Sequence, residues 1–502
     1  INPGVTVQST GGSLSFNAGD DFINNGTALA ANNINVTAGA SDLDGCGAVL
    51  HTGTLQAPNV KVDAIQDICV DSIGQAGSTV LLSSTGGAVV DCNDPPAGTT
   101  NVTGSRFFFD ASTGVGTGAG GAIETAVDNV EGDTSTGGID LADADALSIG
   151  GVGAAGGLNV TTSGPLHVTA GGTISLVDTD GLQNVSDASG AVTLTANGAS
   201  SDITDTVDND AVTASGGTLT LTAGRDILLG TVGLSHDNDV RASGSVTLSA
   251  GRDVVVDGFS DVASDDFGTN TGGDVNVTAL RDVNIANNDG NDASIGSSGT
   301  GGADTIVHAT NAFNLTAPSS AALFSQSGRV TVTANTMSLT SGAGITASAG
   351  SITLNAADGL TLPTDVVHTP GRLTANFDSP NDDPGTGETF TLTGSLNVGS
   401  AIVNGGPDGD TFTISADPTA PLQLNGKAGN DQFSGGAGAE VMRGGQGADH
   451  LTGGGGADTL RGGRGNDTLN GVDGAAGDLV DGDAGTDTCT SDPGDTVREC
   501  EA

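Results

Sequence analysis

The chain has 502 residues, of which 84 are Gly, and its 60 acidic and 13 basic side chains give a formal net charge of −47. It contains no Trp or Tyr and is rich in Asp, Thr, Asn and Val, a composition that suits strands and turns and excludes a mostly helical protein. The negative charge excludes nucleic acid and anionic lipid as partners, because both bind clustered Lys and Arg. No apolar run approaches the ~18 residues of a membrane span.

Internal repeats are the main feature of the first 390 residues. Three segments align, namely Gly217-Thr-Leu-Thr-Leu-Thr-Ala-Gly-Arg-Asp-Ile227, Gly244-Ser-Val-Thr-Leu-Ser-Ala-Gly-Arg-Asp-Val254 and Gly273-Asp-Val-Asn-Val-Thr-Ala-Leu-Arg-Asp-Val283. Each alternates apolar with polar residues, which predicts a half-buried strand, and related copies recur roughly every 19 to 29 residues. One copy cannot bury its apolar face, whereas stacked copies can. The sequence therefore predicts an all-β fold, with a parallel β-solenoid (β-helix) over residues 1–390 and a stacked ladder of the Arg-Asp pairs.

These segments resemble the repeats of filamentous-haemagglutinin-type exoproteins, whose units read Gly-x-Leu-x-Leu-x-Ala-Gly-x-Asp-Ile. The resemblance implies an extended adhesin or surface fibre. The segment Asp378–Gly387 is rich in Pro, Gly and Asp and interrupts the strand pattern, so we place a domain boundary there. We expect a second domain over residues 391–502.

From Gly426 to Asn470 the second domain consists of consecutive nonapeptides of the form Gly-Gly-x-Gly-x-Asp-x-apolar-x. Glycines at the first, second and fourth positions permit turn conformations that other residues cannot adopt and leave carbonyl oxygens exposed. The sixth position supplies a carboxylate. With one outlying copy before the run and two irregular copies after it, the predicted metal ligands are Asp410, Asp431, Glu440, Asp449, Asp458, Asp467, Asp478, Asp487, Gly429, Gly447, Gly456 and Gly465.

Two nonapeptides form one coil of about 18 residues, so carboxylates one coil apart should stack. The expected pairs are Asp431 with Asp449, Glu440 with Asp458, and Asp449 with Asp467. Two carboxylates and several backbone carbonyls form an all-oxygen site, which suits Ca²⁺. Mg²⁺ fits less well because it keeps its waters, and zinc would require nitrogen or sulfur ligands. The sequence predicts several calcium ions as cofactors.

The same run resembles the repeats-in-toxin (haemolysin-type) calcium-binding β-roll. The resemblance implies a roll whose eighth-position apolar residues point inward. Glu440 departs from the usual Asp, and we expect its longer side chain to reshape that one site.

The five cysteines indicate an oxidising compartment. Cys489 and Cys500 are predicted to form a disulfide that caps the roll. Cys46, Cys69 and Cys92 are spaced at about one coil, and adjacent rungs lie within disulfide reach. Either Cys46–Cys69 or Cys69–Cys92 can form, or the three side chains form a buried ladder, and a leftover thiol is available for pairing between subunits.

Two classes of function compete. The first is a secreted calcium-binding structural protein, extracellular or at the cell surface and exported by bacterial-type secretion. It would be an adhesin or a filament subunit, and its partners would be other copies of itself or surface glycans. Strand pattern begins at Gly4–Phe16 with no preceding lid, and Ile1 replaces an initiating Met. We therefore expect a removed export signal and docking of the first rungs onto a neighbouring copy.

The alternative is a secreted polysaccharide lyase or epimerase, because such enzymes also join β-helices to calcium rolls. They bind sugars through aromatic side chains and commonly use Tyr, Lys, Arg or His in acid–base catalysis, whereas this chain lacks Tyr and Trp. We assign no catalytic residue and expect a protein that is not an enzyme.

Overall fold

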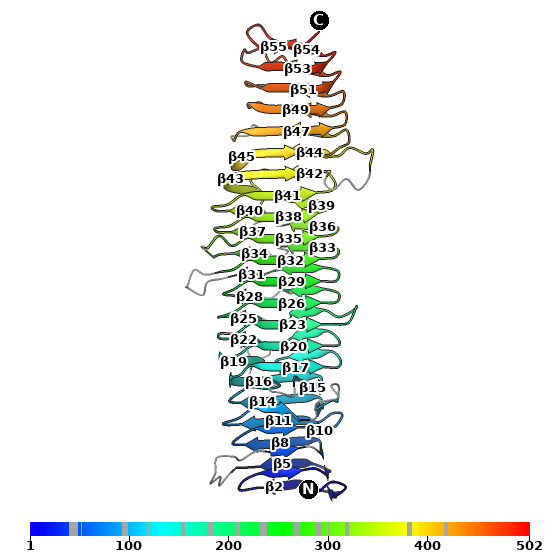
Figure 1. Ribbon diagram of the computed structural model, residues 1–502, viewed down its shortest axis with the longest axis vertical. Coiled ribbons are helices and arrows are strands. Elements are labelled where there is room, and N and C mark those ends of the chain that lie inside the picture. The colour runs from blue at the N-terminus through cyan, green and yellow to red at the C-terminus, as the bar shows by residue number, and fades with distance from the viewer. Residues whose placement is uncertain are drawn as a thin grey trace. The chain divides into compact units, whose positions relative to one another are not determined.

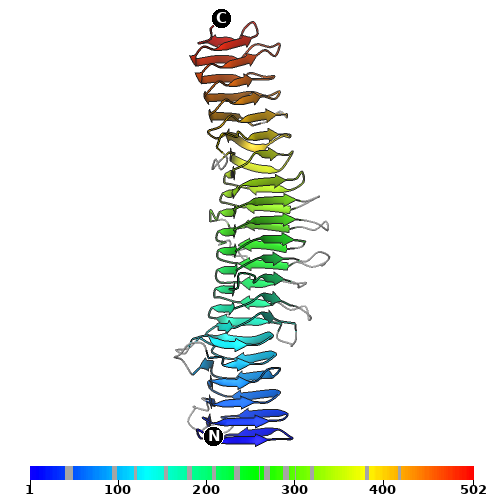
Figure 2. The same cartoon turned by 90° about the vertical axis from the view of Figure 1, so that its right-hand side faces the viewer.

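A computed structural model describes residues 1–39, 49–51, 53–92, 99–117, 121–151, 156–177, 184–205, 211–230, 238–258, 260–264, 272–286, 293–299, 301–316, 321–378, 384–415 and 420–501. The chain divides into two compact units, Ile1–Arg252 and Asp253–Ala502. Within each unit the strands pair in parallel from coil to coil, and no helix occurs among the described residues (Figure 1). Figure 2 shows the strands of successive coils lying one above the next within each unit. The predicted all-β solenoid is confirmed.

The first unit is built from ladders whose members recur once per coil. One ladder consists of β1 (Thr6–Ser9), β4 (Thr27–Ala30), β7 (Thr54–Gln56), β10 (Ser72–Gly74), β13 (Val102–Thr103), β15 (Ile123–Ala126), β17 (Ile139–Asp143), β20 (Leu166–Ala170), β23 (Val192–Ala196), β26 (Leu219–Ala223) and β29 (Val246–Ala250). A second ladder consists of β2 (Leu14–Asn17), β5 (Asn33–Thr37), β8 (Asn59–Ala64), β11 (Thr79–Ser84), β14 (Arg106–Ala111) and β16 (Asn129–Thr136).

Beyond β16 the second ladder continues as two. One of them contains β18 (Leu147–Ile149), β21 (Ile174–Leu176), β24 (Ile203–Asp205) and β27 (Ile227–Leu229), and the other contains β19 (Leu158–Ser163), β22 (Val185–Asp187), β25 (Val212–Ala214) and β28 (Asn238–Ala242). A separate four-stranded sheet holds β3 (Phe22–Asn24), β6 (Val49–His51), β9 (Ile68–Val70) and β12 (Val89–Asp91).

The repeated sequence copies occupy equivalent places on successive coils. In the pairing of β26 with β29, Leu219 partners Val246 and Leu221 partners Leu248. All four side chains are fully buried, whereas the intervening Thr220 is only half-buried. Alternation along the sequence therefore becomes an interior ladder of aliphatic side chains and an outer ladder of Thr and Ser, which is the geometry that a period of two dictates.

The Arg-Asp pairs of the repeats form the predicted ladder, with each arginine bonded to an aspartate of the preceding coil. Nε of Arg225 donates to Oδ1 of Asp202 over 2.7 Å, and Nε of Arg252 donates to Oδ1 of Asp226 over 2.7 Å. In the second unit Arg281 makes the same 2.7 Å bond to the aspartate of the coil before it. These ion pairs neutralise aspartates that the turns bury.

A disulfide joins two neighbouring coils of the first unit. Cys69 in β9 is bonded to Cys92, with their Cα atoms 5.5 Å apart. The coils are already in register there, because Val90 of β12 partners Cys69. Of the two pairings that the spacing allowed, the structure contains Cys69–Cys92, and Cys46 lies outside the described residues.

The second unit begins with three ladders. They contain β30 (Val254–Asp257), β33 (Asp282–Ala286), β36 (Ala312–Thr316) and β39 (Thr336–Leu339); β31 (Ser260–Ser264), β34 (Ala293–Ser297), β37 (Ala321–Ser325) and β40 (Gly344–Ala347); and β32 (Val275–Ala279), β35 (Thr305–Ala309), β38 (Val330–Ala334) and β41 (Ile352–Ala356).

Later in the second unit two ladders alternate along the chain. One contains β43 (Val367–Asn376), β45 (Asn397–Asn404), β47 (Leu422–Ala428), β49 (Glu440–Gln446), β51 (Thr459–Gly465), β53 (Leu479–Gly485) and β55 (Thr496–Arg498). The other is a seven-stranded sheet of β42 (Leu360–Leu362), β44 (Thr389–Leu392), β46 (Thr411–Ile414), β48 (Gln432–Ser434), β50 (His450–Thr452), β52 (Thr468–Gly471) and β54 (Thr488–Ser491).

The eighth-position residues of the nonapeptides form the interior of these later coils. Phe412 partners Phe433, which partners Leu451, and Leu451 partners Leu469. All four are fully buried or nearly so, and the rings of Phe412 and Phe433 stack with centroids 4.3 Å apart. Strand pairing also links β42 to β44 across the Pro/Gly/Asp-rich segment, so the roll stacks directly on the preceding coils, and the boundary near residue 390 stays a prediction.

Candidate calcium sites

The sixth-position acids alternate between the two ladders of the roll. On the seven-stranded sheet they immediately precede β48, β50 and β52, and on the other ladder they begin β49 or immediately precede β51 and β53. The turn before each acid is glycine-rich, and the strand after it carries the inward-pointing apolar residue. Every carboxylate therefore lies at the edge of the core. All eight predicted acids are at most 3% exposed, namely Asp410, Asp431, Glu440, Asp449, Asp458, Asp467, Asp478 and Asp487.

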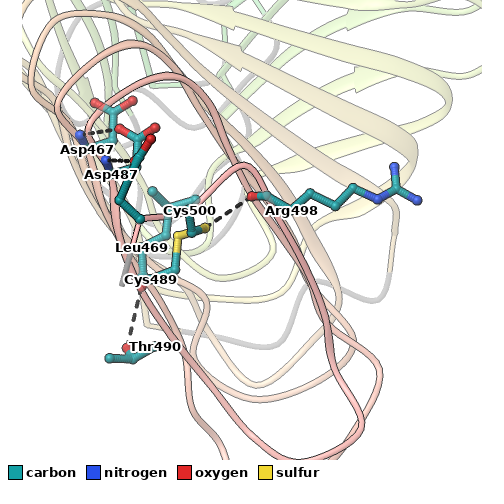
Figure 3. Close-up of a disulfide and its surroundings, with 8 residues drawn as sticks. Asp467, Leu469, Asp487, Cys489, Thr490, Arg498 and Cys500 are labelled. Atoms are coloured by element: carbon teal, nitrogen blue, oxygen red, sulfur yellow. Dashed lines mark hydrogen bonds between the residues drawn. A yellow bond between two sulfur atoms is a disulfide. The ribbon is translucent and has the colours of Figure 1, made fainter.

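On one edge of the roll, each buried acid is hydrogen-bonded to the acid one coil away. The backbone N–H of Asp431 donates to Oδ1 of Asp449 over 2.8 Å, and that of Asp449 donates to Oδ1 of Asp467 over 2.8 Å. The N–H of Asp467 continues to Oδ1 of Asp487, also over 2.8 Å. Figure 3 shows this last step beside the Cys489–Cys500 disulfide. The predicted stacking of Asp431 with Asp449 and of Asp449 with Asp467 is therefore present in the structure.

The opposite edge carries an equivalent ladder. The N–H of Glu440 donates to Oδ1 of Asp458 over 2.8 Å, and the N–H of Asp458 donates to Oδ1 of Asp478 over 2.8 Å. The two-residue insertion before Asp478 lengthens this step from 18 to 20 residues without breaking the ladder. Glu440 occupies the same place as the aspartates, so its longer side chain does not remove it from the stack.

The second oxygen of most of these carboxylates is buried without a hydrogen bond. Among the described residues, no donor contacts Oδ2 of Asp431, Asp449, Asp458, Asp467 or Asp487. An unsatisfied buried charged oxygen costs more than about 1–3 kcal/mol. Such a row of oxygens is expected where a cation supplies the missing interaction.

Glycine at the first position makes room for that second oxygen. A Cβ at position 444, where the chain has Gly444, would lie 2.2 Å from Oδ2 of Asp449 and 2.6 Å from the carbonyl oxygen of Gly462. A side chain would clash in the same way with the sixth-position oxygen, at 2.0–2.6 Å, in place of Gly426, Gly453, Gly462 or Gly482. A carboxylate oxygen and a carbonyl oxygen therefore converge beside each of several first-position glycines.

The fourth-position glycines named in the sequence analysis lie in turns that require a left-handed backbone. Gly429, Gly447, Gly456 and Gly465 have φ values of 112°, 140°, 115° and 138°. The carbonyl oxygen of Gly447 would lie 1.6 Å from a Cβ at position 465, so close stacking of the turns also excludes side chains there. The carbonyls of these four glycines remain predicted ligands. The carbonyls of first-position glycines such as Gly462 were expected to be exposed but were not among the named ligands.

Burial makes the metal-free carboxylates hard to ionise. Burial is the largest of the effects that together raise the pKa of Asp431 to about 8. The hydrogen bond from the N–H of Asp410 lowers this pKa, and the nearby carboxylate of Asp449 raises it further. Burial likewise raises the pKa of Asp449 and of Asp458 to about 6. A bound cation would reverse these shifts, because it favours the charged form.

The ladder extends to two acids that the nonapeptide pattern did not identify, Glu388 beyond Asp410 and Glu501 beyond Asp487. The N–H of Asp410 donates to Oδ1 of Asp431 over 2.7 Å, and the N–H of Glu388 donates to Oδ1 of Asp410 over 2.8 Å. At the other end the N–H of Asp487 donates to Oε2 of Glu501 over 2.7 Å. Glu388 precedes Phe390 by two residues, as a sixth position precedes an eighth, and that spacing could have revealed it. Glu501 lies only 14 residues after its partner, so no periodicity points to it.

The donors of these sites fit Ca²⁺ better than other common cations. Every candidate ligand is an oxygen, from carboxylates and backbone carbonyls, and Ca²⁺ binds 6–8 such ligands in flexible geometry. The orphaned Oδ2 atoms and the glycine-lined space beside them are where the ion would bind, and the ion would neutralise carboxylates that are otherwise buried and repulsive.

Comparison with known families agrees with this geometry. The family model described as RTX calcium-binding nonapeptide repeat (4 copies) matches residues 423–451, 434–469 and 443–476. Comparisons with curated proteins and with solved structures gave no match. RTX nonapeptide repeats bind calcium ions, and they indicate a secreted calcium-binding protein. Residues 423–476 of this chain are therefore RTX calcium-binding nonapeptide repeats.

Proposed function

We propose that this protein is a secreted structural protein, an adhesin or a subunit of a surface fibre, whose roll folds only when calcium is bound. The row of buried carboxylate oxygens without hydrogen bonds carries the proposal. Without a cation those oxygens repel one another inside a thin core, and the coils that they join lose their stacking. Calcium at extracellular concentration then acts as part of the fold, as metals do in small metal-dependent domains.

The outer surface suits contact with other molecules over many coils. Strands such as β26 and β29 present Thr and Ser outward at the regular spacing of the coils. Such a surface can bind a repetitive partner, either surface glycans or another copy of the chain. Nucleic acid is an unsuitable partner, since the net charge of −47 repels it. The part of the chain that the structure describes contains no helix long and apolar enough to span a membrane.

We also propose that the protein is not an enzyme. RTX repeats are typically non-catalytic, and the acids that the roll buries are committed to its ladders. A surface groove of the second unit is lined by Arg372, Ser400 and Gln423 with aliphatic neighbours, and its lining contains no carboxylate.

The test uses the full chain in chelator and in millimolar Ca²⁺. Circular dichroism should show a gain of β structure on adding Ca²⁺, and protease resistance should rise over residues 423–501. Light scattering and electron microscopy of the calcium form then distinguish a fibre subunit from a single-molecule adhesin, and glycan arrays test the adhesin. Unchanged protease resistance of residues 423–501 in chelator would overturn the calcium-dependent fold, and turnover of a polysaccharide would overturn the structural assignment.

A further inference from the structure

Three carboxylates outside the sixth-position ladders meet near residue 481. Asp481 and Asp483 belong to β53, and Glu499 follows β55, the strand that pairs with β53. One carboxylate oxygen from each residue lies within 4.8 Å of the other two. Two oxygens on opposite sides of one Ca²⁺ lie about 4.6–5.2 Å apart, so the three oxygens are spaced to share an ion.

Asp481 is the buried member of this cluster. It is 7% exposed, and its Oδ1 has no hydrogen-bond partner among the described residues. Arginines precede and follow it in the ladder, since Arg461 and Arg498 are its strand partners, yet the described structure contains no ion pair from Asp481 to either one. A buried carboxylate oxygen that accepts no hydrogen bond, in a group of three acids, would be stabilised by a cation bound among them.

The cluster arises where the last coils depart from the repeat. Asp481 occupies the ninth position, where the neighbouring coil carries Arg461, and Asp483 occupies the second position, where that coil carries Gly463. The second position needs a left-handed backbone, with φ of 109° at Gly463 and 60° at Asp483. Asp is one of the few residues other than Gly that adopt this conformation, so Asp483 can place a carboxylate where the neighbouring coil has none.

The third carboxylate is held in place by the disulfide next to it. Glu499 precedes Cys500, which is bonded to Cys489 in β54 with a Cα–Cα distance of 5.9 Å. The backbone of the same segment stacks on the roll, since the N–H of Glu501 donates to the carbonyl of Asp487 over 3.1 Å. The loop closed by the disulfide therefore positions Glu499 over β53.

We propose that Asp481, Asp483 and Glu499 bind an additional Ca²⁺, at a site distinct from the nonapeptide sites. All three donors are carboxylate oxygens, so the site offers no nitrogen or sulfur to zinc. Exposure of Glu499 leaves room for water to complete a coordination of 6–8 oxygens, which Ca²⁺ accepts in irregular geometry and Mg²⁺ does not. This ion would tie β53 to the disulfide-closed loop.

The test counts bound ions on the full-length protein by equilibrium dialysis against radioactive calcium. Asp483→Gly restores the residue of the neighbouring coils and relieves the left-handed backbone, so it folds without the site; Asp481→Asn removes the buried charge at constant volume. Both should bind one ion fewer than the wild type. Asp110→Asn, a charge change in the first unit, should leave the number of ions unchanged.

An unchanged number of bound ions in both cluster variants, with the wild type binding calcium, overturns the additional site and leaves the nonapeptide sites standing. A wild type that binds no calcium overturns the proposed function as well. Circular dichroism identifies a variant that loses ions because its roll has unfolded. In that case the ion count of Asp483→Gly decides whether the additional site exists, because this variant is expected to be at least as stable as the wild type in chelator.

Discussion

Replacing Asp449 by Asn should change the stability of the roll in opposite directions with and without calcium. The amide keeps an Oδ1 that can accept the N–H of Asp431, whose bond to Asp449 is 2.8 Å long. It replaces the unpartnered Oδ2 by a neutral group that cannot ligate a cation. Asp449→Asn therefore removes the charge while retaining the shape and the ladder hydrogen bond.

The size of the metal-free effect follows from the pKa. Burial raises the pKa of Asp449 from 3.8 to about 6, and a shift of this size at 1.36 kcal/mol per unit corresponds to about 3 kcal/mol. Screening by solvent reduces this to roughly 1–2 kcal/mol. Because the folded-state pKa is the higher one, the cost of ionising Asp449 is absent below pH 3.8 and fully present above pH 6. In chelator Asp449→Asn should thus stabilise the roll at pH 8 and have no effect on its stability at pH 3.5.

In millimolar Ca²⁺ the same substitution should destabilise the roll, because Asp449 stacks with both Asp431 and Asp467 and two sites lose a charged ligand. The assay follows β structure by circular dichroism from pH 3.5 to 8, in chelator and in Ca²⁺. The variant should keep its structure to a higher pH than the wild type in chelator, and bind Ca²⁺ more weakly. If Asp449→Asn lowers stability equally in both conditions, the carboxylate is a structural hydrogen-bond acceptor and the reasoning is wrong. Asp449→Ala, which also loses Oδ1, is the control expected to be less stable in both.

Three further predictions concern the calcium sites. Calcium affinity should increase from pH 5.5 to pH 8, because carboxylates with pKa values of about 6 and 8 must lose protons to bind; calorimetry at both pH values measures this, and equal affinities would contradict it. Gly444→Ala should lower calcium affinity at least tenfold, since its Cβ would lie 2.2 Å from a carboxylate oxygen of Asp449, whereas Gly455→Ala, with no neighbour nearer than 3.7 Å, should bind normally. Cys500→Ser should release the loop that stacks on the last coil and weaken one calcium site in the same titration, while Cys69→Ser in the first unit should not.

The pattern of the sequence predicted the main elements because the fold repeats. The Leu-Thr-Leu-Thr-Ala copies that align in the sequence are the strands that pair in register, as Leu219 and Val246 do. An 18-residue spacing was likewise sufficient to pair Asp431 with Asp449. In both cases one physical rule, that equivalent residues of successive coils stack, connects the sequence directly to the structure.

Features that occur once could not be predicted in this way. Cys69 is equidistant in sequence from two other cysteines, so only the three-dimensional structure distinguishes its partner. Glu501, the residue after the disulfide-bonded Cys500, accepts a hydrogen bond from the N–H of Asp487, and no sequence period predicts that contact. The loop closed by the Cys489–Cys500 disulfide brings Glu499 close to Asp481. In the sequence alone, Asp481 resembles any other acidic residue of a turn.

Hydrogen exchange of the full chain, with and without calcium, tests the central claim most directly. Backbone amides of the sixth-position residues, such as Asp431 and Asp449, donate to neighbouring carboxylates and should be strongly protected in millimolar Ca²⁺. They should exchange rapidly in chelator at pH 8, while amides of β26 and β29 in the first unit stay protected in both. Equal protection of Asp431 and Asp449 in the two conditions would contradict the claim that calcium holds the roll together.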